Sequence, residues 1–176
     1  MFFGVFFVIF YLMMILIANA SVALELVGLW FTFRKMGLPG WKGIIPFYGT
    51  YVLFQKLWDV KQFWRMIIYT GIYAGTFLFG YLFSVFGGVF AVTGSDYRAM
   101  SISGVIFLIL GILLMIASIV FLILMPMLQF QLYKKLAHAF GLKDSWAWGL
   151  LFLSFVFLPI IGFHKNIMYY GPVNQV

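Results

Sequence analysis

The chain has 176 residues, of which 65% are hydrophobic and 9% are charged, and its mean hydropathy is +1.11. Soluble domains carry about 25% charged residues, and a water-soluble fold of this size has too small an interior to bury so much apolar surface. These values exclude an ordinary soluble protein and predict a single integral membrane domain over residues 1–176, with the lipid bilayer as its main partner. Cysteine is absent, so disulfides and thiolate metal sites are excluded as well.

The first apolar run covers about residues 2–33 and exceeds the roughly 20 residues that a helix needs to cross the hydrocarbon core. Ala18-Asn19-Ala20 mimics a signal-peptidase cleavage site, but the first basic residue is Arg34 and the apolar run continues past the site. We therefore expect an uncleaved transmembrane helix. It contains Glu25, the one ionisable side chain within the apolar runs.

Residues 34–65 separate the first two apolar runs and are expected to form a structured cytoplasmic loop. Gly37 is predicted to end the first helix, and Pro39-Gly40 suits the centre of a type II turn, in which glycine supplies the positive φ. Pro46 fits the first turn of a further helix over about 46–58. A helical wheel gives this helix an apolar half and a polar half, so we expect it to be interfacial or, as the alternative, re-entrant. The polar half contains Gly49, Val52, Gln55, Lys56 and Asp59.

The second apolar run, about 66–93, is rich in small residues at helical spacing. Such residues let helices approach closely, so we expect them to pack within the bundle, with dimerisation through the same face as the alternative. The residues are Gly71, Gly75, Gly80, Ser84 and Gly88.

The third run covers about 102–133 and is expected to continue as an amphipathic extension that ends at Gly141. A short cytoplasmic loop, about 134–144, leads to the fourth run, about 145–163, which Asp144 or Ser145 is expected to cap. Backbone polar groups in lipid must be satisfied internally, which favours helices. The sequence therefore predicts an all-α, polytopic membrane helix bundle with four transmembrane helices.

Charge predicts the orientation of this bundle. Nine of the eleven Lys and Arg residues fall in the loops 34–65 and 134–144 or at their edges. Positively charged loops stay cytoplasmic, so both termini are expected outside the membrane, and the six tryptophans gather near the cytoplasmic interface in agreement. The same argument explains the net charge of +7 without nucleic-acid binding.

The segment RKMGLPGWKGIIPFYGTY at 34–51 resembles the KAGxPGWxxxIPxYN loop of a family of small bacterial integral membrane proteins of unknown function, often mislabelled signal peptidase I. LAHAFG at 136–141 and GLLFLSFVFLPIIGF at 149–163 agree as well. The resemblance implies a multi-pass protein of the bacterial cytoplasmic membrane. The chain departs from the pattern at Gly49, where the family usually has Asn. We expect the loop motif to fix a shape at the membrane surface through Gly37, Pro39, Gly40, Trp41, Pro46 and Tyr48.

The polar residues offer no catalytic set. A signal peptidase needs a Ser nucleophile and a Lys base near the outer surface. Ser95, Ser101 and Ser103 are expected on that side, but Lys165 is the only lysine there, and the hydrophilic catalytic domain is missing. His138 and His164 lie on opposite predicted faces, so no metal or other cofactor is expected. A carboxylate inside the membrane is costly, which makes Glu25 a candidate proton or cation site. The alternative is that Glu25, about 13 Å along the helix from Arg34, simply reaches the interface.

These observations predict a non-enzymatic accessory or interaction subunit of a larger membrane complex. Its partners would be other membrane subunits, or further copies of the chain as a homo-oligomer. The second hypothesis is a small transporter or channel that uses Glu25, although transporters typically show several buried polar groups and broken helices. A membrane enzyme acting on lipid or peptide is the third hypothesis and has the least support.

Overall fold

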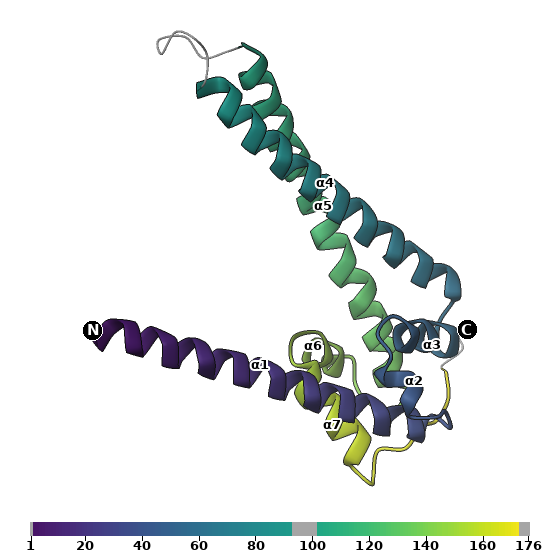
Figure 1. The fold of residues 1–176 in the computed structure, drawn as a ribbon. Coiled ribbons are helices and arrows are strands. Elements are labelled where there is room, and N and C mark those ends of the chain that lie inside the picture. The colour runs from purple at the N-terminus through teal and green to yellow at the C-terminus, as the bar shows by residue number, and fades with distance from the viewer. Residues whose placement is uncertain (1, 93–101, 173–176) are drawn as a thin grey trace. The chain divides into compact units, whose positions relative to one another are not determined.

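The computed structural model describes residues 2–92 and 102–172, and all regular secondary structure in these residues is helical (Figure 1). The helices are α1 (Phe2–Lys35), α2 (Trp41–Ile44), α3 (Tyr48–Leu57), α4 (Val60–Val92), α5 (Ile102–Ala139), α6 (Ser145–Phe152) and α7 (Ser154–Phe163). Three helices of this described part, α1, α4 and α5, are long and apolar enough to cross a membrane. They indicate a multi-pass membrane protein. The predicted end of the second span at residue 93 lies outside the described residues.

The chain divides into two compact units. Unit 1 comprises Met1–Phe63 and Gln129–Val176, and unit 2 comprises Trp64–Leu128. Unit 2 therefore holds most of α4 and the N-terminal part of α5. Unit 1 holds α1, α2, α3, α6 and α7 together with the last turns of α5.

Small residues bring α4 and α5 into close contact in unit 2. A Cβ atom added to Gly80 would lie 2.9 Å from the Met115 side chain, and one added to Gly87 would lie 2.5 Å from the backbone of Leu108. Added to Gly111, it would lie 2.4 Å from the Ser84 hydroxyl. Any larger side chain at these glycines would push the two helices apart.

The contact line on α4 runs through Gly87 and not through Gly88. A Cβ atom at Gly71, Gly75 or Gly88 would meet nothing within 4 Å, whereas Ala91 packs against Gly104. The line therefore has alternating steps of four and three residues, as in left-handed helix pairs. Its members on α4 are Gly80, Ser84, Gly87 and Ala91.

Glycine in the left-handed conformation ends both α1 and α5. Gly37 has φ 74°; its N–H donates to the Arg34 carbonyl at 3.1 Å, and the Leu38 N–H donates to the Phe33 carbonyl at 3.0 Å. The same pair of bonds follows α5 around Gly141, which has φ 69°. Both ends are Schellman motifs, which pair carbonyls that the helix itself leaves free. The predicted helix ends at these two glycines agree with this geometry.

The prediction of a fourth span over 145–163 is wrong. The chain forms two short helices, α6 and α7, that meet at Leu153 (φ −133°, ψ 45°). The rings of Trp146 and Phe157 lie 5.3 Å apart, whereas eleven residues of a straight helix span about 16 Å, so the chain reverses. A Cβ atom on Gly149 would lie 2.5 Å from the Phe157 ring, so glycine makes room for the reversal. At 10 residues, or about 15 Å, α7 covers half of a hydrocarbon core of about 30 Å.

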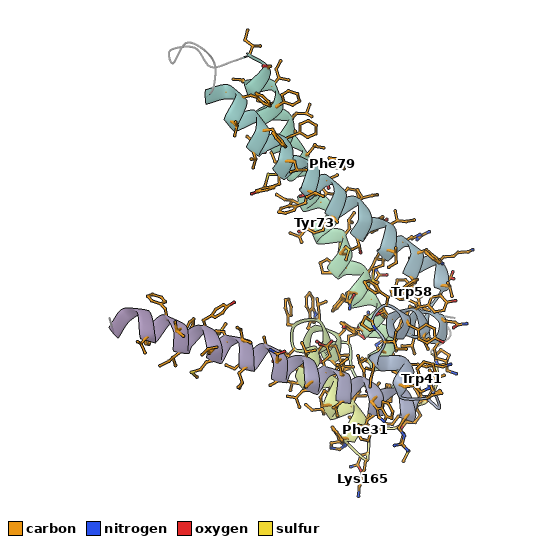
Figure 2. The ribbon with its side chains drawn as sticks, in the orientation of Figure 1. Phe31, Trp41, Trp58, Tyr73, Phe79 and Lys165 are labelled. Carbon is orange, nitrogen blue, oxygen red and sulfur yellow. The ribbon has the colours of Figure 1, made fainter. Side chains whose placement is uncertain are left out.

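The returning helix α7 packs against the last turns of α1 and runs in the same direction. A Cβ atom on Gly28 would lie 2.5 Å from the Pro159 nitrogen. One turn further along, the rings of Phe31 (labelled in Figure 2) and Phe163 lie 4.5 Å apart. The hairpin of α6 and α7 therefore ends beside the basic C-terminal end of α1. The fully buried core of unit 1 includes Phe33, Phe54, Leu132, Leu136, Leu150, Leu158 and Ile161.

The region 34–65, expected as a structured loop with a helix over about 46–58, contains α2, α3 and the start of α4. Gly40 has φ −59°, so the predicted type II turn is wrong. Glycine is needed there for another reason, because a Cβ atom would lie 2.6 Å from the Trp30 indole. Helix α3 also buries Gly49 and Val52, which the helical wheel assigned to the polar half, because this face packs inside unit 1. Figure 2 shows Trp41 on α2 and Trp58 at the end of α3.

Candidate functional site

A cavity of about 230 Å³ lies in unit 1 beside Glu25. It is smaller than the roughly 300–1,000 Å³ of pockets for drug-sized ligands, so it suits an ion with its water or a small molecule. Five helices, α1, α2, α3, α5 and α7, and the segment between α2 and α3 form its walls. The lining residues are Val22, Glu25, Leu26 and Leu29 from α1, Gly43–Phe47, then Gly49, Thr50 and Leu53 from α3, Gln129, Leu132 and Tyr133 from α5, and Leu158 from α7.

Four polar side chains face this mostly apolar cavity: Glu25, Thr50, Gln129 and Tyr133. The Gln129 amide nitrogen donates to the Tyr133 hydroxyl at 3.0 Å, which leaves the Gln129 amide oxygen as an acceptor. Among residues 2–92 and 102–172, no ion pair or hydrogen bond satisfies the Glu25 carboxylate. The cavity therefore has an unpaired acidic group and three further oxygen-bearing side chains in an otherwise apolar lining.

A strained turn forms one wall of the cavity. Phe47 has φ 63° and ψ −44°, and the Tyr48 N–H donates to the Pro46 carbonyl at 2.7 Å, which closes a γ-turn. A side chain in this region costs about 1–3 kcal/mol, and such strain gathers at functional sites. The turn is irregular backbone, which membrane proteins tolerate where it lines a cavity.

The contact between α2 and α3 is close enough to require glycine. A Cβ atom on Gly49 would lie 2.8 Å from the Gly43 carbonyl oxygen. Asn at this position, as in the family that the loop resembles, would need the two helices to move apart. The departure at Gly49 thus has a packing reason in this chain.

Lys35 holds the end of α7 against α1. Its ammonium group donates to the carbonyls of Ile161 and His164 at 2.7 Å each and to that of Ile167 at 3.0 Å. Carbonyls at a helix C-terminus lack helical partners, and a cation there also meets the negative end of the helix dipole. This contact fixes α7, and with it the Leu158 wall of the cavity.

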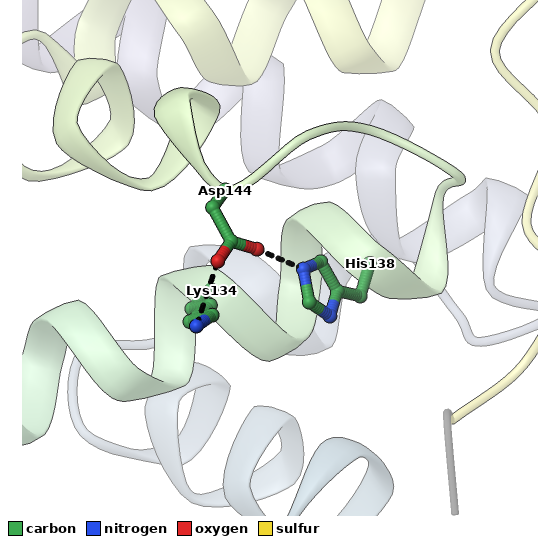
Figure 3. Close-up of polar contacts among 3 residues, drawn as sticks. All are labelled: Lys134, His138 and Asp144. Carbon is green, nitrogen blue, oxygen red and sulfur yellow. Dashed lines mark hydrogen bonds and ion pairs between the residues drawn. The ribbon is translucent and has the colours of Figure 1, made fainter.

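Asp144 ties the start of α6 to the last turns of α5 (Figure 3). Its carboxylate lies 2.7 Å from the Lys134 ammonium and also pairs with the His138 imidazole. These hydrogen bonds, that from Lys134 first, lower the pKa of the Asp144 carboxyl. Asp144 occupies the position before α6, but its side chain forms no cap bond there, contrary to the predicted capping role.

Two of the residues singled out in the sequence lie at the same cavity in the structure. Pro46 from the loop motif lines the same cavity as Glu25, although the two are 21 residues apart in sequence. The other motif positions, from Gly37 to Trp41 and Tyr48, are outside this lining. Sequence reasoning missed Thr50, Gln129 and Tyr133. Gln129 and Tyr133 do carry a signal, since they are polar residues one helical turn apart at the end of an apolar run.

The chain matches no protein-family model, no curated protein and no solved structure with which it was compared. The described residues define the class: a multi-pass membrane protein whose regular structure over 2–92 and 102–172 is helical, with three helices long and apolar enough to cross a membrane and a short helical hairpin. The resemblance of the 34–51 loop to a bacterial family stays a prediction.

Proposed function

We propose that this chain is a non-enzymatic protein of the bacterial cytoplasmic membrane that binds a small cation at Glu25 and works as a small transporter or channel. The observation that supports this function is the unpaired Glu25 carboxylate in the wall of the unit 1 cavity. A carboxylate within a membrane span is costly without a partner, and a bound cation or proton supplies one.

The other polar groups suit the same kind of ligand. Oxygen atoms of carboxylates, amides and hydroxyls are the ligands that hard cations prefer. Thr50, Gln129 and Tyr133 offer such atoms beside Glu25. Irregular backbone at the binding site is also a feature of secondary transporters, and the γ-turn at Phe47, which lines the cavity, fits this description.

The test uses proteoliposomes that contain a dye sensitive to H⁺ or Na⁺. Glu25→Gln keeps the side-chain shape and removes the charge, so we expect cation flux to fall at least tenfold. Asp59→Asn is the matched control, because Asp59 is exposed and lies outside the cavity. Asn also replaces Asp well at a helix N-cap, where the Asp59 carboxylate accepts the Lys61 N–H. Absence of flux in the wild type, or equal flux in both variants, would contradict the proposal.

The second candidate is an accessory subunit of a larger membrane complex. It is favoured by the N-terminal half of α1, where every side chain from Val5 to Ile17 is more than 40% exposed. Such a helix, apolar on all sides, suits contact with lipid or with helices of partner subunits. Purification in a mild detergent followed by mass spectrometry tests this function. Recovery of the chain alone as a monomer would count against it.

We also propose a changed orientation, with the N-terminal end of α1 outside and the C-terminus in the cytoplasm. Three spans put the two ends on opposite sides, unlike the four spans expected from sequence. The bonds of Lys35 and the bond from the Tyr170 N–H to the Ala139 carbonyl (2.8 Å) keep residues 161–170 beside the basic ends of α1 and α5. Basic ends stay cytoplasmic. A reporter fused after Val176 should therefore be active inside the cell. Reporter activity outside the cell would instead support the orientation with both termini outside.

A further inference from the structure

A second pocket, distinct from the Glu25 cavity, lies on the surface of α2 and α3 in unit 1. Its volume is about 280 Å³. Lys42 comes from α2 and Lys56 from α3, and the pocket also offers hydrogen-bond donors from Tyr48 and Gln55. Its other lining residues are the apolar Leu38 and Val52.

The two lysines give this pocket a positive charge. Among the described residues, no carboxylate lines the pocket and neither Lys42 nor Lys56 forms an ion pair. Lys42 has a different neighbour, the Trp41 ring, with its ammonium 6.0 Å from the ring centroid. Two positive charges that face one hollow repel each other, and an anion between them removes this repulsion. The pocket is therefore suited to an anionic ligand.

The surroundings of the pocket are apolar and aromatic. The Trp41 ring stacks on that of Tyr48 with centroids 6.3 Å apart, and the two side chains are 49% and 38% exposed. Phe47, next in sequence to Tyr48, is 69% exposed. Exposed aromatic rings of this kind lie at the interface of a bilayer, where they meet both the headgroups and the start of the acyl chains. A ligand that fits both features carries an anionic head and an apolar body.

We propose that the pocket between Lys42 and Lys56 binds the phosphate-bearing headgroup of an anionic phospholipid, while Trp41 and Phe47 contact its acyl region. Basic pockets beside membrane helices bind anionic headgroups in this way. The Tyr48 hydroxyl and the Gln55 amide would donate hydrogen bonds to the phosphate oxygens. This site does not depend on Glu25, so it stands or falls separately from the transport function.

The experiment is native mass spectrometry of the full chain in detergent, titrated with phosphatidylglycerol or phosphatidylcholine. Near an anionic headgroup each lysine contributes a factor of about five, so Lys42→Gln with Lys56→Gln should weaken phosphatidylglycerol binding about 25-fold. The control is Lys61→Gln with Lys143→Gln, which removes the same charge from two exposed lysines outside the pocket. This control should change phosphatidylglycerol binding less than twofold. A variant with arginine at both Lys42 and Lys56 should still bind phosphatidylglycerol.

Three outcomes would overturn the proposal. Equal weakening in both double variants would show that total charge, and not the pocket, attracts the lipid. Equal binding of phosphatidylcholine would show that the anionic charge is not recognised. Displacement of phosphatidylglycerol by millimolar inorganic phosphate would identify a free anion as the ligand. Circular dichroism of each variant checks that the helices are intact.

Discussion

The Lys35 ammonium group holds the end of α7 against α1 through three carbonyls, so its removal should release that end. Lys35→Met keeps the length of the side chain and removes the ammonium group. The change removes the ammonium donor from three carbonyls, those of Ile161, His164 and Ile167. The His164 carbonyl still accepts the Ile167 N–H at 3.2 Å. The change leaves the apolar contacts between α1 and α7 in place, so the expected effect is local detachment of the end of α7.

The size of this effect follows from the three bonds. A hydrogen bond from a charged group contributes about 1.5–3 kcal/mol, so three would contribute roughly 5–9 kcal/mol if all were shielded from water. Lys35 is half-buried and its bond to His164 is exposed. In the variant, water can therefore hydrogen-bond to some of the carbonyls and offset part of the lost free energy. We therefore expect local opening to become easier by about 2–4 kcal/mol. This corresponds to an opening constant about 30- to 900-fold larger.

Amide hydrogen exchange measures the opening directly. The amides of residues 164–170 should lose protection in Lys35→Met, whereas those of unit 2 should be unchanged. Lys143→Met is a control for the loss of an exposed lysine, because the Lys143 side chain is outside both pockets and both ion pairs. Exchange in residues 164–170 that stays within a factor of three of the wild type would refute the role given to Lys35.

Three further predictions concern separate parts of the chain. Because the pKa of the Asp144 carboxyl is lowered in the folded state, its ion pairs stabilise the protein above the ordinary pKa of about 4, and this stabilisation is lost as pH falls through the folded pKa. Thermal unfolding between pH 6 and pH 3 should show this loss of stability. The Asp144→Asn variant should not show the loss. Gly111→Val should destabilise the α4–α5 contact by about 1–3 kcal/mol in thermal unfolding, since its Cβ meets the Ser84 hydroxyl, whereas Gly88→Ala has open space and should change little. Phe47→Gly should raise stability by about 1 kcal/mol, since glycine relieves the positive φ and the Phe side chain is mostly exposed.

Each of these has a contradicting result. An unchanged pH dependence in Asp144→Asn would assign the acid sensitivity to other groups. Equal unfolding temperatures for Gly111→Val and Gly88→Ala would show that the helices separate without cost. A large loss of stability in Phe47→Gly would mean that the exposed ring carries more energy than the strained backbone.

The sequence by itself determined the properties that depend on composition and on short-range geometry. A long apolar run forces a helix, because backbone groups in lipid have no other partners, and this argument predicts α1, α4 and α5. The stops at Gly37 and Gly141 depend only on the residues around each helix end, so they too can be predicted locally. The charge pattern predicts by the same kind of reasoning that the basic segments share one side of the membrane, and this orientation stays a prediction.

Only the tertiary structure decided which residues meet. Hydropathy is uniform through 145–163 and cannot reveal the reversal at Leu153, which depends on the space that Gly149 leaves for Phe157. Gly87 and Gly88 are adjacent and equally small, so the sequence cannot tell which of them contacts another helix. The structure shows that Gly87 lies against Leu108 of α5 and that Gly88 has open space. The cavity at Glu25 is formed by segments far apart in the chain. Gln129 and Tyr133 are polar residues one turn apart in the sequence, but only the structure shows that they line the same cavity as Glu25, because side-chain contact depends on distance in space and not along the sequence.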